Sequence, residues 1–377
     1  MKEFSVIVFI IISGSIVNLF SGDIGLYGDI NMSGTYHNKP EGEKENSVTA
    51  EIDVTGNHNF KFKVGKFFAH HNLMLNQKGE FDYKLYEAYL SIYPSDYLNL
   101  TFGRQRINWG SGYLFNPTDA LHPRSMDGSK EMGFTGISFM AATGSNFYID
   151  LCIDIYDCFG ADKIMNGLKY ALYTSLTAGK IDMAASFVYQ YDRHLRPGFS
   201  ISADVFNFIL NLETALEFIN NAAYPESSTT LSHKSDFYPH LILDAGIERT
   251  FSSDVLSFTM VFEYLYNMTG YKKNEFRGFY NGAAFLIPED EYPEYFGRHY
   301  FACSFTFDFT ELLITEHSIL WNTQDRSLGG NHSLTYIGFS GFDLKTGFSW
   351  NAGKRNKSEF GSIPDRFLVE AGAVVHF

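Results

Sequence analysis

Side chains that could position a polar solute are concentrated in the stretch 97–123. Leu98, Leu100 and Phe102 alternate with polar or small residues, the pattern of a β-strand with one apolar face. The segment that follows is too long and too rich in special residues to be a simple connection. We expect it to form a loop that narrows a pore or covers its mouth. With its flanks it supplies the candidate constriction residues Arg104, Gln105, Arg106, Trp109, Asn116, Asp119 and Arg124.

The two arginines beside Gln105 have two possible placements. Strict alternation puts Gln105 on the polar face of its strand and Arg104 and Arg106 on the other face. The arginines would then lie at the rim, paired with lipid headgroups or loop carboxylates. A bulge at Gly103 would instead re-aim them into the pore. There, basic side chains opposed to acidic ones would orient a dipolar solute.

Acidic residues occupy the polar faces of several other alternating segments. Rings of carboxylates attract cations and repel anions at short range, so these residues predict a negative lumen. The formal net charge of −14 points the same way and argues against nucleic acid as a partner. The predicted lumen acids are Asp150, Asp154, Glu213, Glu217, Asp244, Glu248, Glu263, Asp308 and Glu370.

Motifs for catalysis or metal binding are missing from the sequence. It contains no P-loop, G-x-S-x-G, H-E-x-x-H or C-x-x-C. His70 and His71 are adjacent and would point to opposite faces of a strand, so they would not share a metal. The cysteines Cys152, Cys158 and Cys303 lack metal-ligand spacing, although the first two could close a small loop. We expect neither a cofactor nor a metal. A rim-built hydrolase remains a minor alternative.

The elements that must position these residues are predicted to be β-strands long enough to cross a membrane. Between 300 and 309, for example, aromatic residues and Cys303 alternate with polar or small residues. About 18 such strands are predicted, or 16 if the hairpins near 58–76 or 197–218 are misread. Their expected bounds are 23–34, 48–56, 58–68, 82–93, 97–107, 131–142, 145–155, 168–177, 180–191, 197–205, 208–218, 239–250, 254–266, 298–308, 311–322, 332–339, 342–351 and 365–377.

The connections between these strands fall into two classes. Short turns are expected after even-numbered strands, at 56–57, 94–96, 143–144, 178–179, 252–253 and 340–341, nearly all with turn-forming residues. Longer segments follow odd-numbered strands, among them 108–130, 219–238 and 267–297. Short turns at one end and long loops at the other are typical of an outer-membrane barrel. A content of 17% aromatic residues with a mean hydropathy of −0.14 also suits an apolar exterior around a polar interior.

Both ends of the chain indicate export to an outer membrane. Residues 1–21 have the outline of a cleaved secretory signal, with Lys2 before an apolar run. That run is too short to span a membrane as a helix, so residues 22–377 would have to insert as a barrel. The last segment alternates up to the terminal Phe377 and looks like the strand that the barrel-assembly machinery recognises.

The constriction stretch also carries a resemblance. Gly103-Arg104-Gln105, Trp109-Gly110 and 116–119 (NPTD) resemble the G-R-Q...W-G...N-P-x-D hairpin of an uncharacterised family of bacterial outer-membrane barrels. That family is related in architecture to the alginate-export type of 18-stranded channels. The resemblance implies a passive channel or exporter without a cofactor. The excess of acidic residues in this chain differs from what is expected of a polyuronate exporter, which would need a basic lumen.

Taken together, the sequence predicts an all-β, antiparallel, up-and-down transmembrane barrel in the outer membrane of a Gram-negative-type bacterium, reached by Sec-type export. The predicted function is a porin-like channel for small polar or cationic solutes, narrowed by the loop 108–130. The expected partners are outer-membrane lipid, the barrel-assembly machinery and the solutes, whereas the oligomeric state is open. The alternative is a surface adhesin or structural barrel that acts through its long loops, including Tyr271, Phe276, Tyr280, Tyr292 and Tyr295.

Overall fold

A computed structural model describes most of the chain. The described residues are 24–38, 47–62, 64–76, 79–119, 121, 134–144, 146–155, 167–190, 194–218, 223–225, 231–233, 239–271, 295–310, 312–339, 342–354, 358–362 and 367–376. The predicted signal segment, Arg124, Phe377, Cys158 and much of the loops 108–130, 219–238 and 267–297 lie outside them. No helix in the described part has the length and hydropathy needed to cross a membrane.

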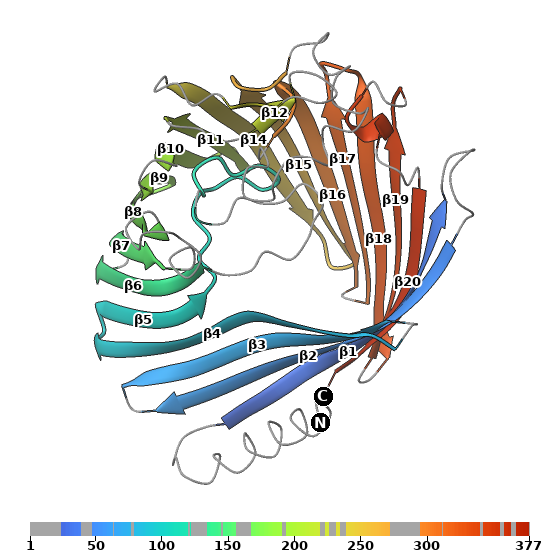
Figure 1. Cartoon of the computed structure of the whole chain (residues 1–377), viewed down its shortest axis with the longest axis horizontal. Helices are drawn as coiled ribbons and strands as arrows, with labels where there is room; N and C mark the ends of the chain where they lie inside the picture. The colour runs from blue at the N-terminus through green and yellow to red at the C-terminus, as the bar shows by residue number, and fades with distance from the viewer. Residues whose placement is uncertain are drawn as a thin grey trace.

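Within the described residues, 18 strands form one antiparallel sheet in which each strand pairs with its sequence neighbours (Figure 1). β1 pairs with both β2 and β20, which completes the ring. A small separate hairpin, β12 (Ala223–Pro225) and β13 (Leu231–His233), lies in the connection between β11 and β14. The strands of the large sheet are β1 (Ile24–Asn38), β2 (Ser47–Phe62), β3 (Gly65–Asn76), β4 (Phe81–Ser95), β5 (Leu98–Gln105), β6 (Phe134–Thr143), β7 (Phe147–Asp154), β8 (Lys169–Ala178), β9 (Ile181–Gln190), β10 (His194–Val205), β11 (Phe208–Glu217), β14 (His240–Ser252), β15 (Leu256–Asn267), β16 (His299–Phe309), β17 (Leu313–Asn322), β18 (Ser327–Phe339), β19 (Phe342–Ala352) and β20 (Phe367–His376).

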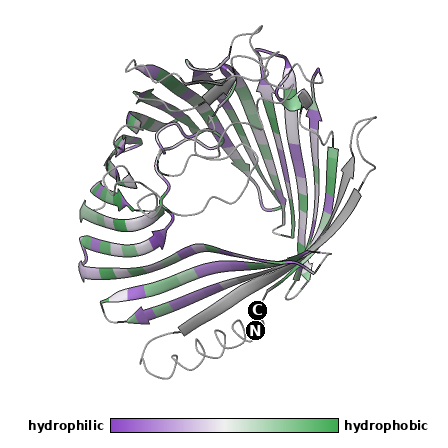
Figure 2. Ribbon diagram, viewed as in Figure 1, coloured by the Kyte–Doolittle hydropathy of each residue, from purple (hydrophilic) through white to green (hydrophobic). Residues whose placement is uncertain are grey.

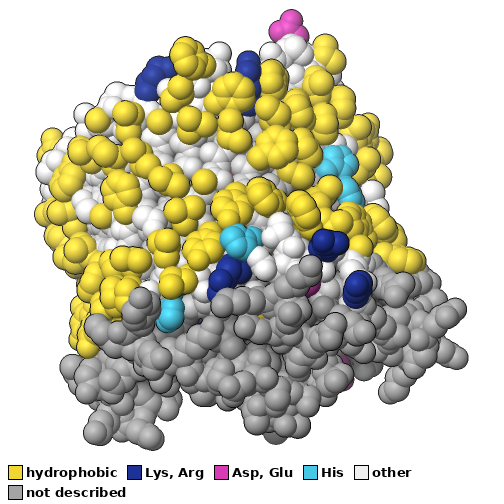
Figure 3. Space-filling model, turned by 90° about the horizontal axis from the view of Figure 1, so that it is seen from above, with side chains coloured by type: hydrophobic (Ala, Val, Ile, Leu, Met, Phe, Trp, Pro, Cys, Tyr) yellow, Lys and Arg dark blue, Asp and Glu magenta, His cyan; other side chains and the backbone are white. Residues whose placement is uncertain are grey.

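The two faces of this sheet differ as the alternation predicts. Along β11, Leu210, Leu212 and Leu216 are exposed, whereas Glu213 between them is fully buried. Apolar and polar residues alternate along many of the strands (Figure 2). Hydrophobic side chains therefore cover much of the outer wall, with a few histidines and basic residues among them (Figure 3). The polar side chains face the lumen.

The predicted count of 18 strands is confirmed, and 16 is excluded, because both doubtful hairpins form. One predicted turn is wrong. Gly56 and Asn57 lie inside β2, opposite His71 and His70 of β3. A Cβ at Gly56 would come within 2.8 Å of His71 Nε2, so this glycine makes room for an imidazole rather than for a turn. The connection between β2 and β3 lies at residues 63–64, and β3 begins at Gly65.

The remaining short turns are at one end of the barrel. Those at 96–97, 179–180, 206–207 and 253–255 follow even-numbered strands of the ring, as predicted. Phe206 and Asn207 both have positive φ, at 52° and 64°, which is the geometry of a two-residue hairpin loop. The long connections β5–β6, β11–β14 and β15–β16 are at the opposite end. After β5, the chain runs inside the barrel rather than around its edge (Figure 1).

Candidate functional site

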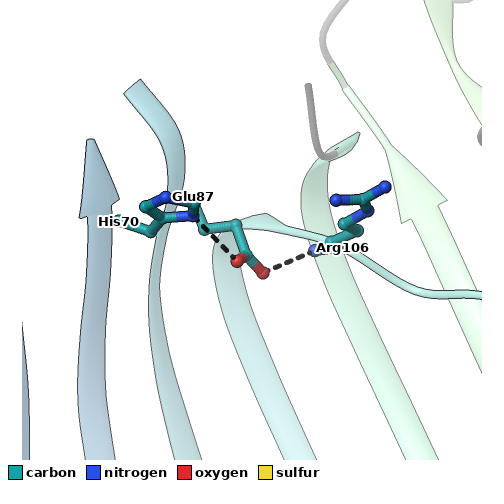
Figure 4. Close-up of polar contacts among 3 residues, drawn as sticks. All are labelled: His70, Glu87 and Arg106. Atoms are coloured by element: carbon teal, nitrogen blue, oxygen red, sulfur yellow. Dashed lines mark hydrogen bonds and ion pairs between the residues drawn. The ribbon is translucent and has the colours of Figure 1, made fainter. Parts of the chain in front are cut away.

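The inward loop, residues 106–119, starts where β5 leaves the wall. Gln105 ends the strand with its side chain buried on the lumen side, where Ser138 Oγ donates to its Oε1 at 3.0 Å. The next backbone N–H, that of Arg106, donates to Glu87 Oε1 at 3.1 Å (Figure 4). His70 Nδ1 lies 3.8 Å from the other oxygen of Glu87. Glu87 on β4 therefore marks the point at which the backbone turns away from the sheet.

Arg104 and Arg106 lie on different sides of the barrel wall. The ladders of β5 with β4 and with β6 are regular on both sides of Gly103, so no bulge re-aims Arg104. Arg104 shares the outward face with Phe102 and donates to Leu85 O at 2.8 Å and to Thr135 Oγ1 at 3.2 Å. Arg106 lies beyond the strand and lines a cavity of about 290 Å³ together with Lys66. The pore role predicted for Arg104 is therefore wrong, whereas Arg106 does reach the lumen side.

Trp109 fixes the first part of the inward loop against the inner wall. Its side chain is 2% exposed and stacks on Tyr173 of β8, with ring centroids 5.2 Å apart. Cys152 of β7 and Val188 of β9 belong to the same buried cluster. Cys152 is a free thiol. This apolar contact anchors the loop to a wall that otherwise presents polar side chains to the lumen.

Glu213 of β11 binds the middle of the loop. Its Oε1 accepts the backbone N–H groups of Ser111 and Gly112, the latter at 2.6 Å. Its Oε2 accepts from Thr118 twice, from the hydroxyl at 2.9 Å and from the backbone at 3.3 Å. A side chain at Gly112 would not fit, because its Cβ would come within 1.7 Å of Phe115 O. A carboxylate accepts stronger hydrogen bonds from backbone N–H groups than a neutral carbonyl does.

Glu263 of β15 binds the tip of the loop. Its oxygens accept the consecutive backbone N–H groups of Tyr113 at 2.5 Å, Leu114 at 2.7 Å and Phe115 at 3.0 Å. Phe115 then enters a buried cluster that includes Tyr300 of β16. The carboxylates of Glu213 and Glu263, which we call the carboxylate clamp, therefore fix the loop across the lumen.

The NPTD segment closes the loop as a compact turn. Asn116 Nδ2 donates to Trp109 O, Thr118 Oγ1 donates to Asn116 Oδ1 at 3.2 Å, and Asp119 N donates to Asn116 O at 3.2 Å. Arg196 of β10 donates to Pro117 O at 2.6 Å. Asn116 and Asp119 are only 3% and 2% exposed, so they shape the loop rather than line open lumen.

The nine predicted acids fall on the lumen-facing side of their strands but differ in exposure. Glu248 and Asp308 are half-buried and Glu370 is exposed. The other six are buried: Asp150, Asp154, Glu213, Glu217, Asp244 and Glu263. Two of these form the clamp, Asp154 lies 4.0 Å from Lys169, and Asp150 accepts from Cys152 Sγ at 3.5 Å. Much of the predicted negative lumen is therefore occupied in holding the protein together.

A second polar cluster lies among the connections at the long-loop end. This loop hub consists of Tyr271, Tyr300, Asn322, Asp325 and Glu359. Tyr271 donates to Asp325 Oδ2 at 2.6 Å, and Tyr300 donates to Glu359 Oε2 at 2.8 Å. Asn322 donates to Tyr271 and to Glu359, and the backbone N–H of Glu359 donates to Asp325. Four segments of the chain are joined in this way.

Burial shifts the pKa values of two hub residues that lie outside the strands, Glu359 and Tyr271. It raises the pKa of Glu359 to about 7, although hydrogen bonds from Asn322 and Tyr300 pull it back and Asp325 adds to the rise. Burial and the neighbouring carboxylates also raise the pKa of Tyr271. Tyr271 and Tyr295, two of the five aromatic residues predicted to serve an adhesive surface, are 9% and 2% exposed. They pack inside the protein, and the other three lie outside the described residues.

Polar residues that hold the inward loop were not predicted, among them Glu87, Thr118, Arg196 and Asn211. Asn211 donates to Ser111 O at 3.2 Å. Each lies on a polar face or within the NPTD segment, so alternation alone could have placed them on the lumen side. Their partners are about 20 to 100 positions away in sequence, which alternation does not reveal.

Known proteins resemble the chain in fold rather than in sequence. No protein-family model matches it, and no curated protein matches it in sequence. The crystal structure of Acinetobacter baumannii OccAB4 matches with a TM-score of 0.62 at 9% identity, covering 94% of this chain and 98% of that one. OccAB1 of the same organism matches at 0.60 and 11%, covering 94% and 96%. Pseudomonas aeruginosa OccK2 in complex with glucuronate matches at 0.60 and 10%, covering 94% and 97%.

These matches establish the fold as that of the 18-stranded Occ and OprD outer-membrane porins. The narrower resemblance to alginate-export-type channels is not confirmed by them.

Proposed function

We propose that this protein is an outer-membrane, porin-like channel for small polar or cationic solutes, with a pore narrowed by the loop 106–119. The observation that carries the proposal is the carboxylate clamp, which fixes a loop inside a barrel of 18 strands. A ring of this size is too wide for wall side chains alone to fill. A loop bound across the lumen sets the size of what passes. Its likeness in fold to porins supports the same conclusion.

The charge of the lumen favours polar and cationic solutes over anions. Glu248, Asp308 and Glu370 are the predicted acids that remain at least partly exposed. Lys66 and Arg106 face a cavity on another sector of the wall. Glucuronate, the ligand in the OccK2 structure, is an anionic sugar, whereas this chain carries a net charge of −14. Opposed acidic and basic sectors would orient a dipolar solute as it passes the loop.

Planar bilayers test the proposal directly. Purified protein should give discrete conductance steps, and a salt gradient should give a reversal potential that favours cations. A double variant, Glu213→Gln with Glu263→Gln, should give larger or noisier steps, because each amide has one acceptor oxygen where the carboxyl group has two and the loop loses some of its hydrogen bonds. Glu316→Gln on β17, an exposed acid away from the clamp, is the matched control. A membrane that stays sealed at all voltages would refute the channel.

The cellular location forms part of the proposal. We infer that residues 1–21 are removed after Sec-type export, that the barrel-assembly machinery inserts the chain, and that lipid surrounds its apolar wall. The terminal aromatic Phe377 would provide the assembly signal. Deleting it should shift the protein from the outer-membrane fraction to periplasmic aggregates, detected by fractionation and by heat-dependent gel migration. An unchanged membrane fraction would argue against that role.

A further inference from the structure

The outer wall carries a groove that the channel function does not use. A cavity of about 510 Å³ lies on β14–β18, lined mainly by outward-facing apolar residues. That volume falls in the range of about 300–1,000 Å³ typical of ligand pockets. Phe262, Phe301 and Trp321 are 43%, 48% and 42% exposed, so their side chains stand outward. The view of Figure 3 shows such a wall, covered by hydrophobic side chains.

The groove follows from the sizes of neighbouring side chains in the sheet. One cross-strand row reads Ala245, Tyr264, Phe301 and Trp321, from β14 to β17. Side chains in such a row lie about 4.5–5.5 Å apart, so a small residue next to large ones leaves a gap. Ala245 provides one small position in this row.

The adjacent row supplies the second small position. It reads Ile247, Phe262, Cys303 and Ile319, with the free thiol Cys303 between two larger side chains. The two rows together give an elongated apolar depression on the wall.

The polar groups of the groove gather at one end. Tyr264 and His299 share a hydrogen bond of 2.6 Å between the hydroxyl and Nδ1. Trp321 adds an indole N–H donor in the same row. These residues lie near the ends of β15, β16 and β17 at the side of the barrel where the long β15–β16 connection lies. In a porin fold the long connections are external, so the groove lies in the outer half of the membrane. Tyr and Trp occupy that depth in membrane proteins.

We propose that this groove binds one acyl chain of the phosphorylated glycolipid that forms the outer leaflet of a Gram-negative outer membrane. The groove is continuous with the apolar wall, which fits a hydrocarbon chain, and its donors lie at the external end, which fits an acceptor-rich phosphorylated headgroup. The proposal relies on the outer-membrane location but not on conduction. A sealed barrel could bind the lipid, and a conducting barrel could fail to bind it.

Cys303 provides the first test. In a Cys152→Ser, Cys158→Ser background, the Cys303 thiol of detergent-solubilised protein should react with a maleimide. Adding purified hexa-acylated lipid A should slow that reaction, because the chain would cover the thiol. Phosphatidylglycerol and phosphatidylethanolamine should protect less. Equal reactivity with and without lipid A would overturn the proposal, as would stronger protection by a phospholipid.

Filling the groove provides the second test. Ala245→Trp should abolish the lipid A adduct in native mass spectrometry, because the indole would occupy the depression. Ala371→Trp on β20 places the same side chain on an exposed, outward-facing position outside the groove and should keep the adduct. Heat-dependent gel migration verifies folding of both variants. A lipid A adduct that survives in Ala245→Trp would overturn the proposal. If that variant fails to fold, the Cys303 reaction decides.

Discussion

Glu213 and Asp244 face each other across β11 and β14, and both side chains are fully buried. Glu213 accepts four hydrogen bonds from the inward loop, whereas neither oxygen of Asp244 has a hydrogen-bond partner among the described residues. Buried polar groups are normally hydrogen-bonded, and leaving one unmet costs about 1–3 kcal/mol. The hydrogen bonds to the loop therefore stabilise the burial of Glu213, whereas the burial of Asp244 destabilises the fold.

Asp244→Asn should stabilise the barrel. The amide removes a carboxylate beside two others and can donate to Glu213, so we expect a gain of about 1–2 kcal/mol. Urea unfolding in detergent, followed by the shift from folded to unfolded gel mobility, measures the change. Asp308→Asn, at a half-buried lumen position, is the control and should be near neutral. A lower midpoint for Asp244→Asn would contradict this account.

Gly112→Ala should disturb the loop without disturbing the wall. The added methyl group would collide with Phe115 O, so the backbone must leave the clamp. Single-channel recordings should show altered conductance with more fluctuations, while heat-dependent gel migration stays that of a folded barrel. Gly347→Ala on β19, where a Cβ meets nothing closer than 3.8 Å, should behave as wild type. Identical traces from the two variants would show that the loop tolerates the methyl group.

Ion selectivity should depend on the exposed lumen charges. Glu248→Gln combined with Asp308→Asn should reduce the preference for cations, because each removes a partly exposed negative charge. Lys66→Gln combined with Arg106→Gln should increase it. Reversal potentials under a salt gradient measure both effects, and high salt should weaken them by screening. If neither pair changes the reversal potential, selectivity arises elsewhere.

The loop hub should be more stable in acid. Because burial raises the pKa of Glu359 to about 7 in the folded state, the protonated form is the one that the fold favours. The contribution of Glu359 to stability is complete below the ordinary pKa of a glutamate, about 4.3. It is lost as the pH rises through about 7, where the buried carboxyl group ionises. Protease resistance of the connected loops should therefore fall over that interval.

The hub variant Glu359→Gln should remove most of this pH dependence, since the amide cannot ionise. Its resistance to protease should resemble that of the wild type in acid at every pH. Glu370→Gln on β20, an acid exposed to the lumen, keeps Glu359 intact and should retain the wild-type profile. A pH profile unchanged by Glu359→Gln would assign the effect to another group.

The alternation of polar and apolar residues predicted the number of strands and the face of the sheet on which each side chain lies. Each side chain of a strand points to the face opposite its neighbour's, so the count of strands and the lumen side of Glu213, Asp244 and Glu263 could be derived locally. The same rule placed Arg104 on the outward face, where it lies. It also placed Arg106 there, which was wrong because β5 ends at Gln105 and Arg106 lies just past it.

Contacts across the lumen could not be derived in this way. Glu263 and Tyr113 are 150 positions apart, and nothing in the local pattern of either marks the other. The turn predicted at Gly56 failed for a similar reason, since the space beside this glycine is filled by His71 from the next strand. Fold class followed from periodicity, whereas the clamp depends on which polar faces meet after the ring has closed.

Apart from the Thr118 hydroxyl, the clamp binds the loop through main-chain N–H groups, which every residue except proline provides. The side chains at 113 and 114 therefore do not take part in those hydrogen bonds, and Tyr113 is 45% exposed. Substitutions there can retune the passage while the attachment to the wall persists. The attachment of the loop and the choice of solute therefore depend on different atoms. Residues 113 and 114 can change the solutes that pass, while the hydrogen bonds that hold the loop stay the same.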